Sequence, residues 1–281
     1  MAYALWGIVP LYWTLLRGVP PVEIIAHRVL WGMFAFFAIV ALAGAGPAFR
    51  AALRDRKTVA VMAVSGTLLV INWGTFVGAV AADRLLDASL GYFINPLVSI
   101  ALGMLVLRER LRRLQWVAIG FALAGVAIRT WTIGHVPWIS LVLAASFGTY
   151  GLVRKLARVE SLVGSAVETA VIAPAAAIYL AVLALGGGGA LGRTSLSTEL
   201  LLVSTGVVTA LPLLLFNSAA RRLPLSTLGF LQYLAPTGQF ILAVTVNGEP
   251  FARAQLVAFG LIWVGLAVFS VDRLRLSRTD R

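Results

Sequence analysis

Residues 96–127 read PLVSIALGMLVLRERLRRLQWVAIGFALAGVA, and residues 236–267 read PTGQFILAVTVNGEPFARAQLVAFGLIWVGLA. The two stretches align without a gap at one constant offset, which places Pro96 on Pro236. Residues with special chemistry or backbone freedom match along the alignment: Pro96 with Pro236, Glu109 with Glu249, Arg113 with Arg253, Gln115 with Gln255, Gly120 with Gly260 and Gly125 with Gly265. Apolar helices resemble one another by chance, but such matches do not follow from apolar composition. The alignment therefore predicts an internal duplication.

The composition indicates that lipid is the solvent for most of this chain. Of the 281 residues, 60% are hydrophobic and only 12% are charged, and the mean hydropathy is +0.94. A soluble domain carries about a quarter charged residues. The net charge of +12 would suggest nucleic acid in a soluble protein, but the basic residues lie in short gaps between apolar runs, so we expect no nucleic-acid partner. The absence of cysteine excludes disulfides and thiolate metal sites.

The apolar runs predict about ten transmembrane helices, because crossing the hydrocarbon takes roughly 20 helical residues. We predict spans near residues 2–17, 22–44, 59–81, 89–107, 114–132, 136–153, 161–185, 199–219, 226–246 and 254–271. The first span begins at Met1 without the basic segment of a cleaved signal peptide. We expect the natural start to lie upstream of Met1.

The distribution of basic residues predicts the orientation in the membrane. The gaps after the second, fourth, sixth and eighth spans, together with the C-terminal tail, hold most of the lysines and arginines, Arg154 among them. The opposite loops hold only Arg17, Arg84, Arg129, Arg193 and Arg253. Because cytoplasmic loops carry the excess of basic residues, both termini are expected in the cytoplasm of a bacterium and the chain in its inner membrane.

Five spans in each half is an odd number, so the second half should enter the membrane upside down. We predict a first repeat over residues 1–133, an inverted second repeat over 134–273 and a basic cytoplasmic tail over 274–281. Inverted repeats recur in secondary transporters, whose solute sites lie near the bilayer midplane between the repeats. The alternative is a duplicated scaffold without a transport role.

Several segments resemble the EamA family of the drug/metabolite transporter superfamily, and within it the RarD-like permeases. These segments are LWGIVPLYW (5–13), EIIAHRVLWG (23–32), INWG (71–74), DASLGYFINPL (87–97), YGLVRK (150–155), VETAVIAP (167–174) and TALPLLLFNSAARRLPLSTLGFLQYLAPT (209–237). They cover nearly the whole chain. The resemblance implies a ten-helix inner-membrane permease, without naming its solute.

Ionisable residues inside the spans are the first candidates for a solute site. An ionisable group in hydrocarbon costs about 2.5–3.5 kcal/mol, so it usually faces the bundle interior and a partner. The offset that places Pro96 on Pro236 also aligns Arg28 with Glu168. We expect both to face a central cavity and help bind a charged or zwitterionic solute, with His27 lining a proton path. The alternative is a structural pair between two helices, with Glu23 and His27 as interfacial groups.

Pro96 and Pro236 are hinge candidates, because they lie at matched positions in the middle of predicted spans. Each removes a backbone donor for the carbonyl four residues earlier, at Tyr92 and Gln232, and such matched interruptions point to a binding site. Further polar candidates for the cavity are Asn95, Tyr233 and Gln239, and Asn72 and Trp73 in span 59–81. The alternatives are kinks satisfied by neighbouring helices and, around Gly74 and Gly78, close helix packing.

The sequence favours one of three classes of function. A secondary carrier for small organic metabolites or drug-like solutes, exporting by alternating access, fits the repeat and the polar positions. An enzyme is not expected, because no HExxH or GxSxG motif is present; neither is a cofactor or a metal. A non-transporting scaffold or accessory subunit is the remaining alternative. Besides the solute and the bilayer, protons are a candidate coupling ion, and a monomer and a homodimer are both compatible with the sequence.

Overall fold

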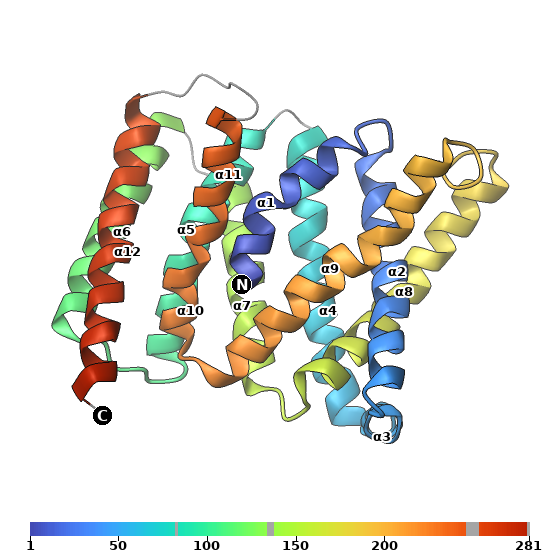
Figure 1. Ribbon diagram of the computed structural model, residues 1–281, viewed down its shortest axis with the longest axis horizontal. Coiled ribbons are helices and arrows are strands. Elements are labelled where there is room, and N and C mark those ends of the chain that lie inside the picture. The colour runs from blue at the N-terminus through green and yellow to red at the C-terminus, as the bar shows by residue number, and fades with distance from the viewer. Residues whose placement is uncertain (82–83, 134–137, 246–252, 280–281) are drawn as a thin grey trace. The chain divides into compact units, whose positions relative to one another are not determined.

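The computed structural model describes residues 1–81, 84–133, 138–245 and 253–279, which form twelve helices and contain no strand (Figure 1). The helices are α1 (Ala2–Thr14), α2 (Pro21–Leu42), α3 (Gly46–Arg54), α4 (Arg56–Ala81), α5 (Leu85–Leu105), α6 (Arg113–Ile133), α7 (Trp138–Leu156), α8 (Ser161–Leu185), α9 (Leu196–Arg222), α10 (Leu225–Gln232), α11 (Leu234–Thr245) and α12 (Arg253–Thr279). The predicted all-helical class is confirmed. Glu249 of the aligned repeat lies outside the described residues.

Five of these helices, α2, α4, α7, α8 and α9, are long and apolar enough to cross a bilayer. Shorter apolar stretches occupy Leu90–Leu105 in α5, Arg113–Ile128 in α6 and Leu256–Asp272 in α12. Helix α1 has 13 residues and ends at Thr14, before the predicted end of the first span at residue 17. The count of ten spans is therefore supported directly for five helices and stays a prediction for the rest.

The ninth predicted span, 226–246, is divided into α10 and α11 at Tyr233. Pro236 has no N–H to donate to the carbonyl of Gln232, so one hydrogen bond of the α-helical pattern is missing there. The Tyr233 amide instead donates to the carbonyl of Phe230 at 3.2 Å, the shorter spacing of a 3₁₀ turn. Helix α5, in contrast, continues through Pro96. The two prolines thus have different effects on equivalent segments.

Helix α3 was not predicted. It lies between α2 and α4, is the most amphipathic of the twelve helices, and packs against α2 and α8. Phe49 and Ala52 form its inner face, next to Met62, Val163 and Val167. Its nine residues are too few and too basic to match a span, so a search for long apolar runs passes over it.

Helix starts repeat at the offset found in the sequence. Helices α2, α4, α5 and α6 begin at residues 21, 56, 85 and 113, and helices α8, α9, α10 and α12 begin at 161, 196, 225 and 253. Each start in the second set is separated from its counterpart in the first by the same offset that relates Pro96 to Pro236. Three of these equivalent pairs also pack directly, α2 against α8, α5 against α10 and α6 against α12.

The described helices belong to two compact units. The first comprises residues 1–77 and 153–222, and the second comprises residues 78–152 and 223–281. Each unit therefore contains helices from both halves of the sequence, and the boundaries fall within α4 and α7. The assignment of residues 1–133 and 134–273 as repeats is a statement about the sequence and stays a prediction.

Equivalent glycines bring α6 and α12 together in the second unit. A Cβ atom on Gly125 would lie 2.9 Å from the carbonyl oxygen of Ala258, and one on Gly265 would lie 2.8 Å from that of Ala118. Ala118 and Ala258 are themselves equivalent positions of the repeat. Ala118 of α6 thus meets Gly265 of α12, and Gly125, later in α6, meets Ala258, earlier in α12. The two helices therefore run antiparallel.

We predict that Gly125→Ala and Gly265→Ala destabilise the protein, because the added methyl group would meet backbone that cannot move aside cheaply. Overpacking of this kind costs about 1–3 kcal/mol, which should lower the apparent melting temperature of the detergent-purified protein by several degrees. Gly120→Ala and Gly260→Ala are matched controls on the same two helices, because no atom lies within 4 Å of either added Cβ. Equal melting temperatures for the two pairs would contradict the packing described.

Candidate functional site

Arg28 is the eighth residue of α2, and three other helices of the first unit contribute to its surroundings. Its Nε donates a hydrogen bond to the hydroxyl of Thr209 on α9 at 3.1 Å. Its guanidinium carbon lies 4.8 Å from the ring centroid of Trp13 on α1 and 4.4 Å from that of Trp73 on α4. A cation over two indole faces is stabilised by the negative potential of each ring. The side chain is half-buried.

The backbone around Arg28 is held by small residues and by a tyrosine. Gly206 of α9 packs against the backbone of Trp31, where a side chain would clash, so α9 approaches α2 closely. The Tyr12 hydroxyl donates to the carbonyl of Leu201 and lies 2.7 Å from the hydroxyl of Ser204. These contacts fix the end of α1 on α9 and so set the position of Trp13. Asn72, next to Trp73 on α4, is half-buried.

Glu168 lies on α8 with only 1% of its side chain exposed. It accepts a hydrogen bond from the hydroxyl of Ser65 on α4. Nη1 of Arg154, at the end of α7, lies 3.6 Å from its Oε2. Arg154 is itself 2% exposed, so this is a buried ion pair. Such a pair is tolerated only when further hydrogen bonds satisfy both groups.

Arg154 has those further contacts. Its Nη2 donates to the carbonyl of Ser161 at 3.1 Å and to the hydroxyl of Ser165 at 3.2 Å, and Nη1 lies 2.7 Å from the sulfur of Met62. Asn217 on α9 donates to the same Ser165 hydroxyl at 2.9 Å. The network joins α4, α7, α8 and α9 within the first unit.

Glu23 and His27 are buried in the first unit, each with 2% of the side chain exposed. Glu23 accepts a hydrogen bond from the amide of Ala190 at 2.5 Å, which ties the loop after α8 to the start of α2. The Trp31 indole donates to Nδ1 of His27 at 3.2 Å, so a neutral His27 carries its proton on Nε2. That nitrogen lies 3.7 Å from Glu23 and has no hydrogen-bond partner.

The remaining candidates belong to the second unit. Asn95 is 5% exposed, and its carbonyl oxygen Oδ1 has no hydrogen-bond partner. The Tyr233 hydroxyl donates to the carbonyl of Phe93 at 3.2 Å, and these two residues are equivalent positions of the repeat. The Ser99 hydroxyl lies 3.5 Å from the amide oxygen of Gln232. The side chain of Tyr92 is exposed. Gln239 lies in α11, and its side chain is outside the described part of the chain.

Backbone and proline contacts accompany these side chains. The carbonyl oxygen of Pro96 would lie 2.7 Å from a Cβ on Gly229, so α10 packs directly on the backbone of α5 at the proline. Pro236 is buried, and Thr237 beside it bonds back to the carbonyl of Tyr233. The break at Tyr233 is therefore held by packing and hydrogen bonds.

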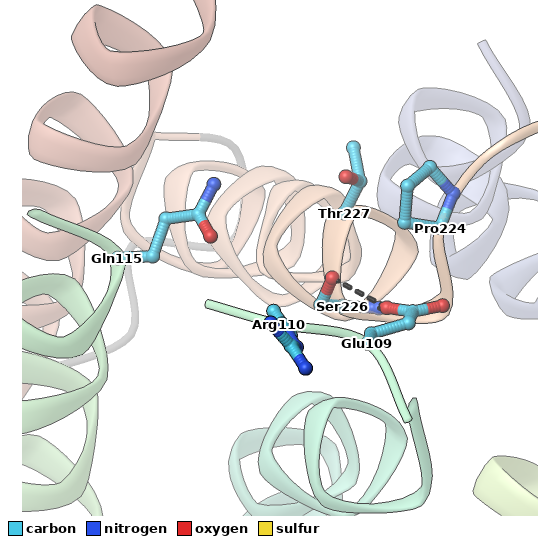
Figure 2. A pocket seen from close by; sticks show the side chains of 6 residues that line it. All are labelled: Glu109, Arg110, Gln115, Pro224, Ser226 and Thr227. Atoms are coloured by element: carbon cyan, nitrogen blue, oxygen red, sulfur yellow. Dashed lines mark hydrogen bonds between the residues drawn. The ribbon is translucent and has the colours of Figure 1, made fainter. Parts of the chain in front are cut away.

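A pocket of about 210 Å³ in the second unit is lined by Glu109, Arg110, Gln115, Pro224, Ser226 and Thr227 (Figure 2). The Glu109 carboxylate accepts hydrogen bonds from the amides of Leu225 and Ser226, at 2.6 and 3.0 Å, and from the Ser226 hydroxyl at 2.7 Å. A carboxylate is favoured at a helix N-terminus. Because these bonds satisfy Glu109, we interpret it as the cap that joins α5 to α10.

Sequence reasoning named Arg28, His27, Trp73 and Glu168 as separate candidates for the cavity but missed Arg154, the ion-pair partner of Glu168. Arg154 was assigned to a basic loop, because the sixth span was expected to end at residue 153. That assignment is wrong: α7 continues to Leu156, and the guanidinium turns inward to the buried carboxylate. Sequence reasoning also did not single out Thr209, Ser65 or Ser165, because single hydroxyl residues are common in apolar helices.

Comparison with known proteins gives consistent matches. The EamA-like transporter family matches residues 1–131. Protein RarD of Salmonella typhi is 47% identical over 277 residues, which cover 99% of this chain and 94% of that protein. Chloramphenicol-sensitive protein RarD of Pseudomonas aeruginosa is 31% identical over 283 residues, covering 99% and 93%. One solved crystal structure superimposes with a TM-score of 0.74 at 21% identity, covering 95% of this chain and 94% of that one, which is a likeness of fold.

We predict that Arg154→Ala strongly lowers stability, because it leaves Glu168 as a buried carboxylate without its cation. Removing one partner of a buried pair costs about 3–5 kcal/mol, whereas replacing both by apolar residues is often neutral. The double variant Arg154→Met/Glu168→Leu should therefore melt at a higher temperature than Arg154→Ala. Arg158→Ala, at an exposed position in the following turn, is the control and should leave the melting temperature unchanged. A double variant less stable than Arg154→Ala would refute this interpretation.

Proposed function

Because the chain belongs to the EamA-like transporter family, we propose that it is a secondary transporter for small organic metabolites or drug-like solutes in the inner membrane of a bacterium. It works by alternating access and exports its solute. Membership of the family rests on relatives up to 47% identical along nearly the whole chain. The further features of the proposal rest on the arrangement of the helices and on Arg28.

The observation that carries the mechanism is the packing of equivalent helices. The end of α8 meets the start of α2 through Ala190 and Glu23, and the loop after α5 meets the start of α10 through Glu109 and Leu225. Helices α6 and α12 meet in the same sense, because Gln115 near the start of one bonds Asp272 on the other. Antiparallel packing of helices related by one constant offset is what an inverted duplication produces, and it supports ten helices in two inverted repeats.

Inverted repeats supply a route to alternating access. If two halves of similar sequence can each adopt two conformations, exchanging those conformations opens the opposite side of the membrane. The unequal effect of the matched prolines fits this scheme, since α5 is continuous at Pro96 whereas its counterpart is divided at Tyr233. Pro96 and Pro236 are accordingly proposed as the hinges.

Arg28 is the residue that we assign to the solute. The charge of a half-exposed guanidinium is energetically costly within an apolar helix, so we expect this side chain to have a function. A planar, permanently charged donor group suits a carboxylate or phosphate, so an anionic or zwitterionic solute is expected. Trp13, Trp73 and Thr209 position the guanidinium. Glu168 is assigned to the support of the fold, and His27 to a proton path in a proton-coupled carrier.

We predict from the distribution of basic residues that both termini and Arg110 and Arg221 are cytoplasmic, whereas Arg17 and Arg193 are external. The chain has no cysteine. A cysteine introduced singly at any of these four exposed positions is therefore the one thiol that a maleimide can label. A membrane-impermeant maleimide should label positions 17 and 193 in intact spheroplasts, and positions 110 and 221 only after permeabilisation. Labelling of position 110 and position 193 from the same side would rule out the inverted topology.

We predict that Arg28→Gln lowers solute counterflow in proteoliposomes at least tenfold, a loss of about 1.4 kcal/mol, because the charged contact with the solute is removed. The solute is first identified by comparing metabolites in cells with and without the protein; chloramphenicol is included because of the name of one relative. Arg28→Lys should retain part of the activity, and Arg17→Gln, at an exposed site, should retain all of it. Full counterflow by Arg28→Gln would remove Arg28 from the site. Absence of counterflow by the wild type for every solute found would favour the scaffold.

A further inference from the structure

Helix α3 and the start of α4 carry a concentrated positive charge. Arg50, Arg54, Arg56 and Lys57 lie within eight residues, and all four side chains are exposed. Asp55 is the one acidic residue among them, and it is engaged as the cap of α4, where it accepts bonds from the Thr58 hydroxyl and the amides of Lys57 and Thr58. These bonds, first of all that from the Thr58 hydroxyl, lower the pKa of Asp55. The segment keeps a local charge of three positive units.

Some apolar side chains of α3 pack against the rest of the protein, and another is exposed. Phe49 stacks edge to face on Phe37 of α2 at 5.3 Å between ring centroids, and Ala52 is buried in the cluster with Met62 and Val163. Leu53, in contrast, is 43% exposed beside the arginines. In Figure 1, α3 is seen end-on whereas α2 and α8 run in the plane of the picture. A helix crossing the end of a membrane span, with basic and apolar groups exposed together, has the character of an interfacial helix.

In the part of the chain that the structure describes, the second half has no helix at the position equivalent to α3. The segment that the repeat aligns with α3 contains the turns of residues 186–195, with four consecutive glycines and one basic residue, Arg193. Packing of the repeated helices therefore does not require α3.

We propose that α3 and the first turn of α4 form a binding surface for the headgroups of anionic phospholipids. Arg50 and Arg54, four residues apart, share one face of the helix and present guanidinium groups to the lipid phosphates, which planar guanidinium groups bind in bidentate fashion. Arg56 and Lys57 extend the surface, and Leu53 enters the adjoining acyl region. Clusters of four to eight basic residues beside a membrane span bind anionic lipid in this way. The partner is the membrane lipid itself, not a soluble protein.

Lipid bound here would also act on the interior of the first unit. The inner face of α3 packs on Met62, and the sulfur of Met62 lies 2.7 Å from Nη1 of Arg154. A headgroup that holds α3 in place therefore secures the apolar cover of the Arg154–Glu168 pair. Anionic lipid is accordingly expected to stabilise the folded unit, and not only to bind at its edge.

The test is native mass spectrometry and thermal melting of the purified full chain with added phosphatidylglycerol or phosphatidylcholine. We expect the wild type to retain several-fold more phosphatidylglycerol and to melt several degrees higher with it than with phosphatidylcholine. The variant Arg50→Gln/Arg54→Gln should lose both differences. The matched control is Arg221→Gln/Arg222→Gln, which removes the same charge from exposed positions at the end of α9 in the same unit, and it should keep them.

Each other outcome overturns the proposal. A wild type without lipid preference would exclude the surface, and equal losses in the two double variants would indicate a general effect of net charge. Inorganic phosphate alone producing the same stabilisation would indicate a soluble anion instead of a lipid. The salt dependence of the wild type provides an independent check. Its preference for phosphatidylglycerol at 50 mM salt should weaken at 500 mM, because the Debye length at 50 mM is about three times longer.

Discussion

Hydrocarbon offers no hydrogen-bond partners, so every polar group buried between membrane helices has to be satisfied within the protein or by what the protein binds. This constraint accounts for the contacts of Glu168, whose carboxylate meets both a hydroxyl and a guanidinium, and of Glu23, which accepts a backbone amide. In the part of the chain that the structure describes, four buried polar atoms have no partner: the Tyr3 hydroxyl, His27 Nε2, Asn95 Oδ1 and Arg154 Nε. Two of these four atoms belong to His27 and Asn95, which are among the residues predicted from the sequence as candidates for the solute site.

The same constraint explains which features were predictable. Helix positions follow from long apolar runs, and the limits of the seventh predicted span, 161–185, agree with those of α8 at both ends. The repeat was visible because packed helices require small residues at fixed places, as Gly125 and Gly265 illustrate. The division at Tyr233 was less predictable, because Pro96 and Pro236 occupy equivalent positions of the repeat, yet α5 is continuous at the first and the chain is divided near the second. Helix α3 escaped prediction because an interfacial helix needs no long apolar run.

For the candidate site, the charged residues were predictable and their partners were not. Arg28 and Glu168 are conspicuous because charge is rare in apolar spans. The contacts described for Glu168 include Ser65 and Arg154, and those described for Arg28 include Thr209, Trp13 and Trp73. Whether Arg154 lies in a loop or meets a buried carboxylate depends on where α7 ends. The extension of α7 beyond its predicted end was enough to turn a predicted loop arginine into a buried one.

The different environments of the two arginines argue for different roles. Arg154 is enclosed, and its two terminal nitrogens contact a carboxylate, a carbonyl, a hydroxyl and a sulfur, so an incoming anion would have to displace these partners. Arg28 is half-exposed, and two of the groups around it are indole faces, which stabilise a cation without neutralising its charge. An indole face and a carboxylate can contact the same guanidinium together, one above its plane and the other along its edge. Under the proposed function, the half-exposed guanidinium of Arg28 is therefore the one that an anionic solute can reach, whereas that of Arg154 is enclosed.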